Sequence, residues 1–179
     1  MSRITRAALA VCASAVAVLG GASAAHADQS TSRAALDGPQ YVRLQAEYSK
    51  NCLAIEKGSL RDVAQAVEAA CSTETDNGVF QLRPLGDATF EIMAKHSGRC
   101  LSTDGNIDQH WCDGGSWQRW NVMLVEVTTE LYELRPVDGP SACLTVGSRR
   151  VFPDDVPTAY LHFCVGSSQQ RWRLLPAVS

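Results

Sequence analysis

The stretch Cys112-Asp-Gly-Gly-Ser-Trp-Gln-Arg-Trp120 occurs a second time, with substitutions, as Cys164-Val-Gly-Ser-Ser-Gln-Gln-Arg-Trp172. In both copies a Gln lies six residues after a Cys, and a Trp lies eight residues after it. A fainter third copy spans residues 71–80, with Phe in the Trp position and one extra residue. Self-similarity at a period of about 40–50 residues indicates a fold built from repeats.

Each copy also has a front half, in which an alternating apolar pair leads to a Cys-Leu dipeptide. The apolar pairs are Val42/Leu44, Phe90/Ile92 and Tyr132/Leu134, and the dipeptides begin at Cys52, Cys100 and Cys143. The three copies agree in both halves, so the sequence predicts three repeats, at about 40–86, 87–127 and 128–176.

The first 27 residues have the pattern of a secretory signal peptide. Two arginines precede an apolar run over residues 7–19, and residues 25–27 (Ala-His-Ala) form a small-x-small cleavage site. The run is too short to cross a bilayer comfortably, and a retained membrane anchor is the alternative interpretation. We therefore expect a secreted, extracellular protein that begins at Asp28, with a flexible linker at 28–39.

The cysteine pattern predicts a disulfide framework. Apart from Cys12 in the signal segment, the cysteines lie in the repeats, and an even number in an exported chain favours disulfides. Spacing alone cannot choose among the possible pairings, but each repeat has one Cys near its front and one near its back. The repeats therefore predict the pairs Cys52–Cys71, Cys100–Cys112 and Cys143–Cys164. The sequence has no Cys-x-x-Cys motif, and no two histidines have the spacing of zinc ligands. We therefore expect no metal site and no cofactor.

Charge and motifs exclude several classes of function. The chain has 16 Lys and Arg against 19 Asp and Glu, for a net charge of −3. This balance, without a basic run, predicts neither a nucleic-acid nor a membrane partner. No histidine stands in a Ser-His-Asp or Cys-His motif, so we do not expect an enzyme. A carboxylate pair for glycoside hydrolysis, Asp104 with Asp108, is the remaining catalytic hypothesis.

From Gln40 onward, short alternating runs separated by turn signals predict an all-β fold. One segment conflicts with this pattern. Residues 60–70 are rich in strong helix formers, whereas their position in the repeat predicts a loop and a strand. We follow the repeat.

With three repeats that carry Cys-Leu and then Cys-x-Gly-Gly-x-x-Gln-x-Trp or a variant, the chain resembles the ricin B-type (Gln-x-Trp) lectin family, which includes bacterial family 13 carbohydrate-binding modules. The resemblance covers about residues 40–176 and implies one disulfide-stapled β-trefoil domain over 40–179, with pseudo-threefold symmetry. A single repeat has too little apolar surface to fold alone, so three must share a core. The resemblance also assigns roles to five side chains. It implies that Phe80, Trp120 and Trp172 are core aromatics and that Gln118 and Gln170 hydrogen-bond the backbone.

The family's sugar-binding residues are replaced in all three repeats. In the family, an Asp follows Cys-Leu, an aromatic residue lies two before the second Cys, and an Asn or similar residue precedes the Gln of Gln-x-Trp. Here the first position holds Ala54, Ser102 and Thr145, the second holds Ala69, His110 and His162, and the third holds Trp117 and Gln169, with no clear counterpart in repeat 1. Repeat 1 is therefore predicted to be empty of binding residues, and repeat 3 has only Tyr160 and His162, with Asp154 and Asp155 on a loop.

The candidate carbohydrate-binding site lies in repeat 2 and consists of Asp104, Asp108, His110 and Trp117. Sugar binding calls for an aromatic platform under the C–H face and a carboxylate that accepts from hydroxyls. Trp111 is a second candidate platform, because one core cannot easily take three Trp within ten residues. Each residue also has a plainer interpretation: His110 and His162 as exposed strand histidines, and Asp104 as a turn residue.

The sequence thus predicts a secreted, non-catalytic carbohydrate-binding module with degenerate sites, acting as a monomer on a glycan. The alternative is a trefoil that binds a protein, of the protease-inhibitor or toxin-accessory type, without sugar binding.

Overall fold

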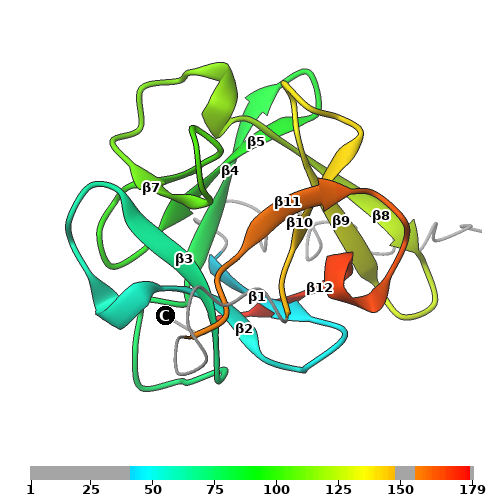
Figure 1. The fold of residues 1–179 in the computed structure, drawn as a ribbon, viewed down its shortest axis with the longest axis horizontal. Helices are drawn as coiled ribbons and strands as arrows, with labels where there is room; N and C mark the ends of the chain where they lie inside the picture. Colours follow the sequence, from blue (N-terminus) through cyan, green and yellow to red (C-terminus); the bar gives the residue numbers. More distant parts are fainter. Residues whose placement is uncertain (1–40, 148–155, 178–179) are drawn as a thin grey trace, which may run out of the picture.

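The computed structural model describes residues 41–147 and 156–177. The predicted signal peptide, the predicted linker, and Asp154 and Asp155 lie outside these residues. The strands are β1 Tyr41–Ala46, β2 Cys52–Ile55, β3 Ala64–Ala69, β4 Phe80–Gly86, β5 Thr89–Ala94, β6 Cys100–Ser102, β7 Asp108–His110, β8 Trp120–Glu126, β9 Leu131–Pro136, β10 Ala142–Thr145, β11 Tyr160–Phe163 and β12 Trp172–Pro176 (Figure 1). Three 3-10 turns join them within the described ranges: η2 Glu56–Gly58, η3 Ser116–Gln118 and η4 Ser168–Gln170.

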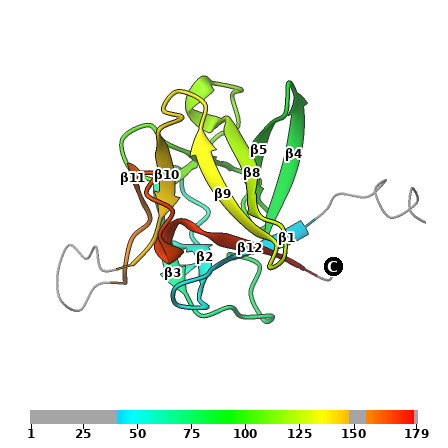
Figure 2. The ribbon, with the colours of Figure 1, turned by 90° about the vertical axis from the view of Figure 1, so that its right-hand side faces the viewer.

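The strands β1, β4, β5, β8, β9 and β12 pair in that order, and β12 also pairs with β1, so they close a barrel. The closure is antiparallel, with Val42 opposite Pro176 and Ala46 opposite Trp172. Figure 2 shows β12 running beside β1, which brings the two ends of the described domain together. A closed barrel leaves none of these strands with an open edge.

The other strands form one hairpin in each repeat: β2–β3, β6–β7 and β10–β11. Each repeat therefore supplies two barrel strands and one hairpin, and Figure 1 shows the repeats, coloured in sequence from cyan to red, around a common centre. This arrangement is a β-trefoil, as the resemblance implied. The segment with conflicting signals is strand β3, because pairing with β2 outweighs the helix propensity of its residues.

The three repeats share one apolar core. Phe80, Trp120 and Trp172 are fully buried in it, as predicted. Each Trp also satisfies its indole N–H, because Trp120 Nε1 donates to Leu101 O and Trp172 Nε1 donates to Leu144 O, both at 3.1 Å. No helix in the described residues is long and apolar enough to cross a membrane.

The three predicted disulfides are confirmed: Cys52–Cys71, Cys100–Cys112 and Cys143–Cys164. In each repeat, one cysteine lies in the first strand of the hairpin and the other lies just after the second strand. In the chain-entropy model a loop of about 15 residues contributes about 3 kcal/mol, so the bridges add substantially to a domain of this size.

The Gln of Gln-x-Trp holds the chain that follows each disulfide, in repeats 2 and 3. Gln118 Nε2 donates to Trp111 O at 2.7 Å, and Asp113 N donates to Gln118 Oε1 at 3.0 Å. Gln170 makes the equivalent bonds, donating to Phe163 O at 2.8 Å and accepting from Val165 N at 2.9 Å. The predicted backbone role of both Gln residues is therefore confirmed.

Candidate functional site

The hairpin of each repeat presents one face whose residues are set by strand register. Opposite residues of an antiparallel pair lie on the same side of the sheet. Ser102 lies opposite Asp108 and Cys100 opposite His110, while Ala54 lies opposite Val67 and Cys52 opposite Ala69. We call Ala54, Val67 and Ala69 the repeat 1 face; Ser102, Asp108 and His110 the repeat 2 face; and Thr145, Tyr160 and His162 the repeat 3 face.

On the repeat 2 face, the structure brings together two of the predicted site residues. His110 Nε2 lies 2.9 Å from Asp108 Oδ1. Both atoms are buried, and among the described residues their polar contact is with each other. Asp108 is only 2% exposed. The pair is therefore a polar contact whose accessible part is the His110 side chain, 24% exposed, beside a buried carboxyl.

The surroundings of Asp108 favour its neutral form. Burial raises the pKa of this carboxyl from 3.8 to about 6. His110 opposes the shift through its charge and hydrogen bonding, while the nearby carboxylates of Asp104 and Asp62 add to it. Asp108 therefore becomes a full anionic acceptor only above about pH 6.

Trp117 and Asp104 lie on neighbouring segments beside this pair. Thr103 N and Oγ1 donate to Trp117 O at 2.9 and 3.1 Å, and Asp104 is the next residue along the chain. The Trp117 side chain is 41% exposed and its ring lies directly over Gly115, where an added Cβ would come within 2.3 Å of a ring carbon. The glycine thus lets the indole lie flat along the loop, as an exposed aromatic platform requires.

Trp111 differs from Trp117 because its ring stacks on a charged side chain, whereas the Trp117 ring lies over the backbone of Gly115. It is 65% exposed, yet the Arg99 guanidinium lies 4.1 Å from its ring centroid. Its backbone N–H donates to Asp62 Oδ1 at 3.0 Å, and the other oxygen of Asp62 lies 3.8 Å from His110 Nδ1. Trp111 therefore belongs to an ionic cluster at the border with repeat 1, and Trp117 is the better platform.

Repeat 1, which the sequence predicted to be empty of binding residues, contains a hollow of about 430 Å³ over its face. Counting back from Phe80 places Gly78 in the Gln position and Asn77 in the position before it, although the sequence analysis found no counterpart there. Asn77 lines the hollow, with Nδ2 donating to Ile55 O at 2.9 Å. The extra residue after Cys71 hid this alignment, and aligning on the core aromatic would have found it.

The repeat 3 face carries two aromatic rings and a threonine. Tyr160 and His162 lie edge to face with ring centroids 6.5 Å apart. Thr145 Oγ1 accepts from Gln170 Nε2 at 3.3 Å, so this position supports the loop. His162 is exposed on its strand, in agreement with the plainer interpretation of that residue.

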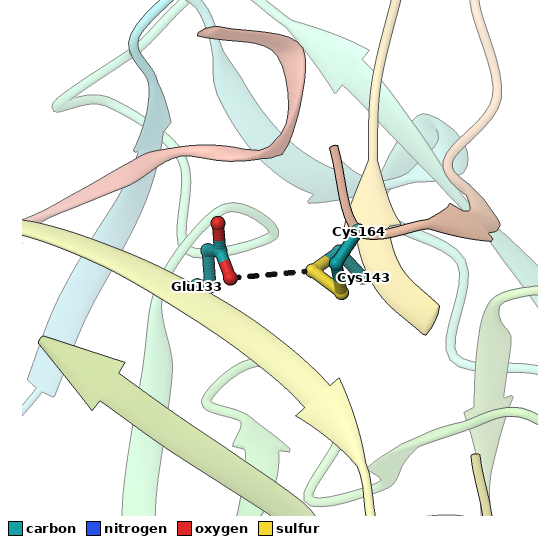
Figure 3. A group of neighbouring side chains, drawn as sticks. All are labelled: Glu133, Cys143 and Cys164. Atoms are coloured by element: carbon teal, nitrogen blue, oxygen red, sulfur yellow. Dashed lines mark hydrogen bonds between the residues drawn. A yellow bond between two sulfur atoms is a disulfide. The ribbon is translucent and has the colours of Figure 1, made fainter. Parts of the chain in front are cut away.

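One cluster in repeat 3 resembles a metal-ligand set. Figure 3 shows Glu133 directed at the Cys143–Cys164 disulfide, with Oε2 3.5 Å from Cys143 Sγ. Because the two sulfurs are bonded to each other, neither is a thiolate, which is the form that binds metal. The Glu133 carboxylate is paired instead with Arg135 at 2.5 Å.

The family model described as ricin-type beta-trefoil lectin domain-like matches residues 31–110. The designed threefold-symmetric protein ThreeFoil is 25% identical, with a TM-score of 0.66 over 75% of this chain and 97% of that one. These findings confirm the resemblance to ricin-type β-trefoil lectins. No curated protein sequence matches the chain.

Two natural proteins share the fold at lower identity. A Polyporus squamosus lectin, solved with a sialylated influenza-binding epitope, is 13% identical with a TM-score of 0.60, over 76% of this chain and 49% of that one. An exo-beta-1,3-galactanase from Clostridium thermocellum is 20% identical with a TM-score of 0.66, over 78% of this chain and 31% of that one. The chain therefore spans less than half of either protein.

Proposed function

We propose that this protein, which resembles ricin-type β-trefoil lectins, is a secreted, non-catalytic carbohydrate-binding module. We propose further that it acts as a monomer. The signal-like residues 1–27 and the three disulfides support export, since such bridges persist in oxidising compartments. The repeat 2 face supports sugar binding.

The observation that carries the proposal is the contact between Asp108 Oδ1 and His110 Nε2, which holds a partly exposed imidazole on the repeat 2 face. A sugar hydroxyl is both a donor and an acceptor, so it can bond to the exposed edge of the imidazole, which the buried Asp108 carboxyl orients. Hydrogen bonds to an ionised carboxylate are stronger than neutral ones. The pair thus supplies the polar half of a sugar site.

Trp117 and Asp104 supply the rest of the site. The exposed indole offers an apolar surface for the C–H side of a pyranose, and Asp104 is an exposed acceptor at the edge. A single site of this kind binds weakly, with a Kd of about 0.1–1 mM.

The test is a titration with neutral mono- and oligosaccharides at pH 7.5, followed by tryptophan fluorescence and calorimetry. We expect Asp108→Asn, and the double variant Trp117→Ala with Asp104→Ala, each to weaken binding about tenfold or more. His162→Ala in repeat 3 is the matched control and leaves affinity unchanged. Unchanged binding in both repeat 2 variants, with circular dichroism confirming the fold, would place the site elsewhere.

The same titration has an expected pH dependence. Because burial holds the pKa of Asp108 at about 6, affinity rises as the pH increases from 5 to 7 and the carboxylate ionises. Asp108→Asn abolishes that rise.

The second candidate is a protein-binding trefoil. It is favoured by exposed apolar side chains on β8 and in the turn after it: Met123, Leu124, Val125 and Val127. Such patches commonly mark protein contacts. Glycan binding that Asp108→Asn removes would overturn this candidate in favour of the first.

A further inference from the structure

The hollow of repeat 1 is the space that a glutamine side chain fills in the other repeats. Gln118 and Gln170 are buried and hydrogen-bonded to the chain after the disulfide, whereas the corresponding residue here is Gly78. The hollow is lined by Gly78 and by the residues of that chain, including Ala70 and Ser72. The absence of a side chain at Gly78 leaves a cavity whose volume is in the range typical of small-ligand pockets.

The Arg43 guanidinium, which has no acidic partner among the residues that the structure describes, lines this cavity. Arg43 lies between Val42 and Leu44, and the equivalent residues of repeats 2 and 3 are Glu91 and Glu133. Both glutamates are buried and ion-paired, Glu91 with Arg83 at 3.5 Å and Glu133 with Arg135 at 2.5 Å. Repeat 1 therefore has a cation where the others have a compensated anion.

Within residues 41–147 and 156–177, Arg43 makes no ion pair and has one hydrogen bond, from Nη2 to Thr75 O at 3.3 Å. Its Nη1 lies 3.5 Å from the point where a Gly78 Cβ would stand, so the guanidinium adjoins the empty space. The other charged residues lining the hollow are already paired. Asp76 pairs with Lys95 at 3.2 Å, and Lys57 pairs with Glu56 at 2.9 Å. The unbalanced charge is that of Arg43.

The rest of the lining suits a sugar ring. Ala54, Ala69 and Ala70 offer small apolar surface for C–H groups. His96 Nε2 lies 3.0 Å from Ser59 O, which places the proton on Nε2 and leaves Nδ1 as a buried acceptor without a partner. A hydroxyl donor is the group that such a nitrogen requires.

We propose that the repeat 1 hollow binds an acidic sugar, with its carboxylate paired to Arg43 and its ring over the alanine surface. The flat carboxylate matches the guanidinium fork and can accept two parallel hydrogen bonds. The sugar part of this inference rests on the proposed carbohydrate-binding function, and the acidic part rests on Arg43 alone. The site is separate from the repeat 2 face.

The test is a residue-resolved NMR titration with glucuronate, glucose and acetate, read at the Gly78 backbone amide. We expect glucuronate to shift this amide with an affinity at least about tenfold greater than that of glucose or acetate. Added salt weakens the interaction, because an exposed ion pair is screened. Equal affinity for glucose would overturn the role of Arg43, and equal affinity for acetate would overturn the sugar assignment.

Four variants separate this site from the repeat 2 face. Arg43→Gln removes the preference for glucuronate, and Arg43→Lys restores part of it because the charge returns. Gly78→Gln places a side chain in the hollow beside Arg43 and removes the glucuronate shift, which in this variant is read at the backbone amide of Asn77. Asp108→Asn leaves the glucuronate shift at Gly78 unchanged, so neutral-sugar binding at repeat 2 and acid binding at repeat 1 stand or fall separately. A preference for glucuronate that persists in Arg43→Gln would contradict the proposal.

Discussion

Repeats 1 and 2 have the same hairpin register and the same disulfide position but opposite chemistry. Repeat 2 has a polar pair, Asp108 and His110, where repeat 1 has Val67 and Ala69. Repeat 1 has a hollow beside an arginine where repeat 2 has the buried side chain of Gln118. The comparison teaches that the trefoil backbone fixes where a ligand face lies, while a few side chains decide what it accepts.

The largest expected effect on stability comes from replacing Gln118 of repeat 2 with glycine, the residue that repeat 1 has at this position. Gln118→Gly removes two hydrogen bonds, leaves Trp111 O and Asp113 N without partners, and opens a cavity. We expect a loss of about 3–5 kcal/mol in the free energy of unfolding, measured by urea denaturation. At Gly78, the control position in repeat 1, an added Cβ would stand 3.2 Å from Leu53 O, so we expect Gly78→Ala to cost some stability but less than Gln118→Gly. A decrease below about 1 kcal/mol in the free energy of unfolding for Gln118→Gly would show that the loop keeps its conformation without the glutamine.

A smaller effect is expected from the buried acid of repeat 2, which repeat 1 lacks. Because the folded pKa of Asp108 is raised to about 6 from 3.8, the folded state keeps this proton longer than the unfolded state does. Its contribution to stability is complete below about pH 4 and is lost as the pH rises through 6.

Asp108→Asn removes that component because the amide does not titrate. Between pH 4 and pH 7 the free energy of unfolding of the wild type therefore falls relative to that of the variant by on the order of 2 kcal/mol. Thermal and urea unfolding at several pH values measure it. Asn106→Ala, at an exposed position without a titratable side chain, is the control and gives a difference that does not vary with pH. A flat difference for Asp108→Asn would mean that the carboxyl is not effectively desolvated.

The smallest effect concerns Trp111, whose counterpart in repeat 1 is Ala70. Trp111→Ala removes the contact between its ring and the Arg99 guanidinium. We expect a loss of about 0.5–1 kcal/mol in stability and no change in sugar affinity, because Trp117 is the platform. Calorimetry on the same sample checks both values. A large loss of sugar affinity would show that Trp111, and not Trp117, is the aromatic platform.

Sequence reasoning reached the scaffold and stopped short of the sites. The cysteine pairs followed from matching positions in the repeats, and the core position of Trp120 and the backbone role of Gln118 were implied by the family resemblance. Asp108, His110 and Trp117 were selected as candidates, but the burial of the Asp108 carboxyl and its contact with the imidazole depend on how β6, β7 and the loop from Asp62 pack. The hollow of repeat 1 was missed, because it arises from atoms that are absent at Gly78.

The sequence by itself determined three all-β repeats and their three disulfides, and its resemblance to the ricin B-type family implied the β-trefoil with a shared aromatic core, because single repeats have too little apolar surface to fold alone. Only the tertiary structure decided which repeat face is polar, which is hollow and which tryptophan is free. Those properties depend on distances between residues far apart in the chain, such as Asp62 from His110 and Arg43 from Gly78, and on the water that their packing excludes.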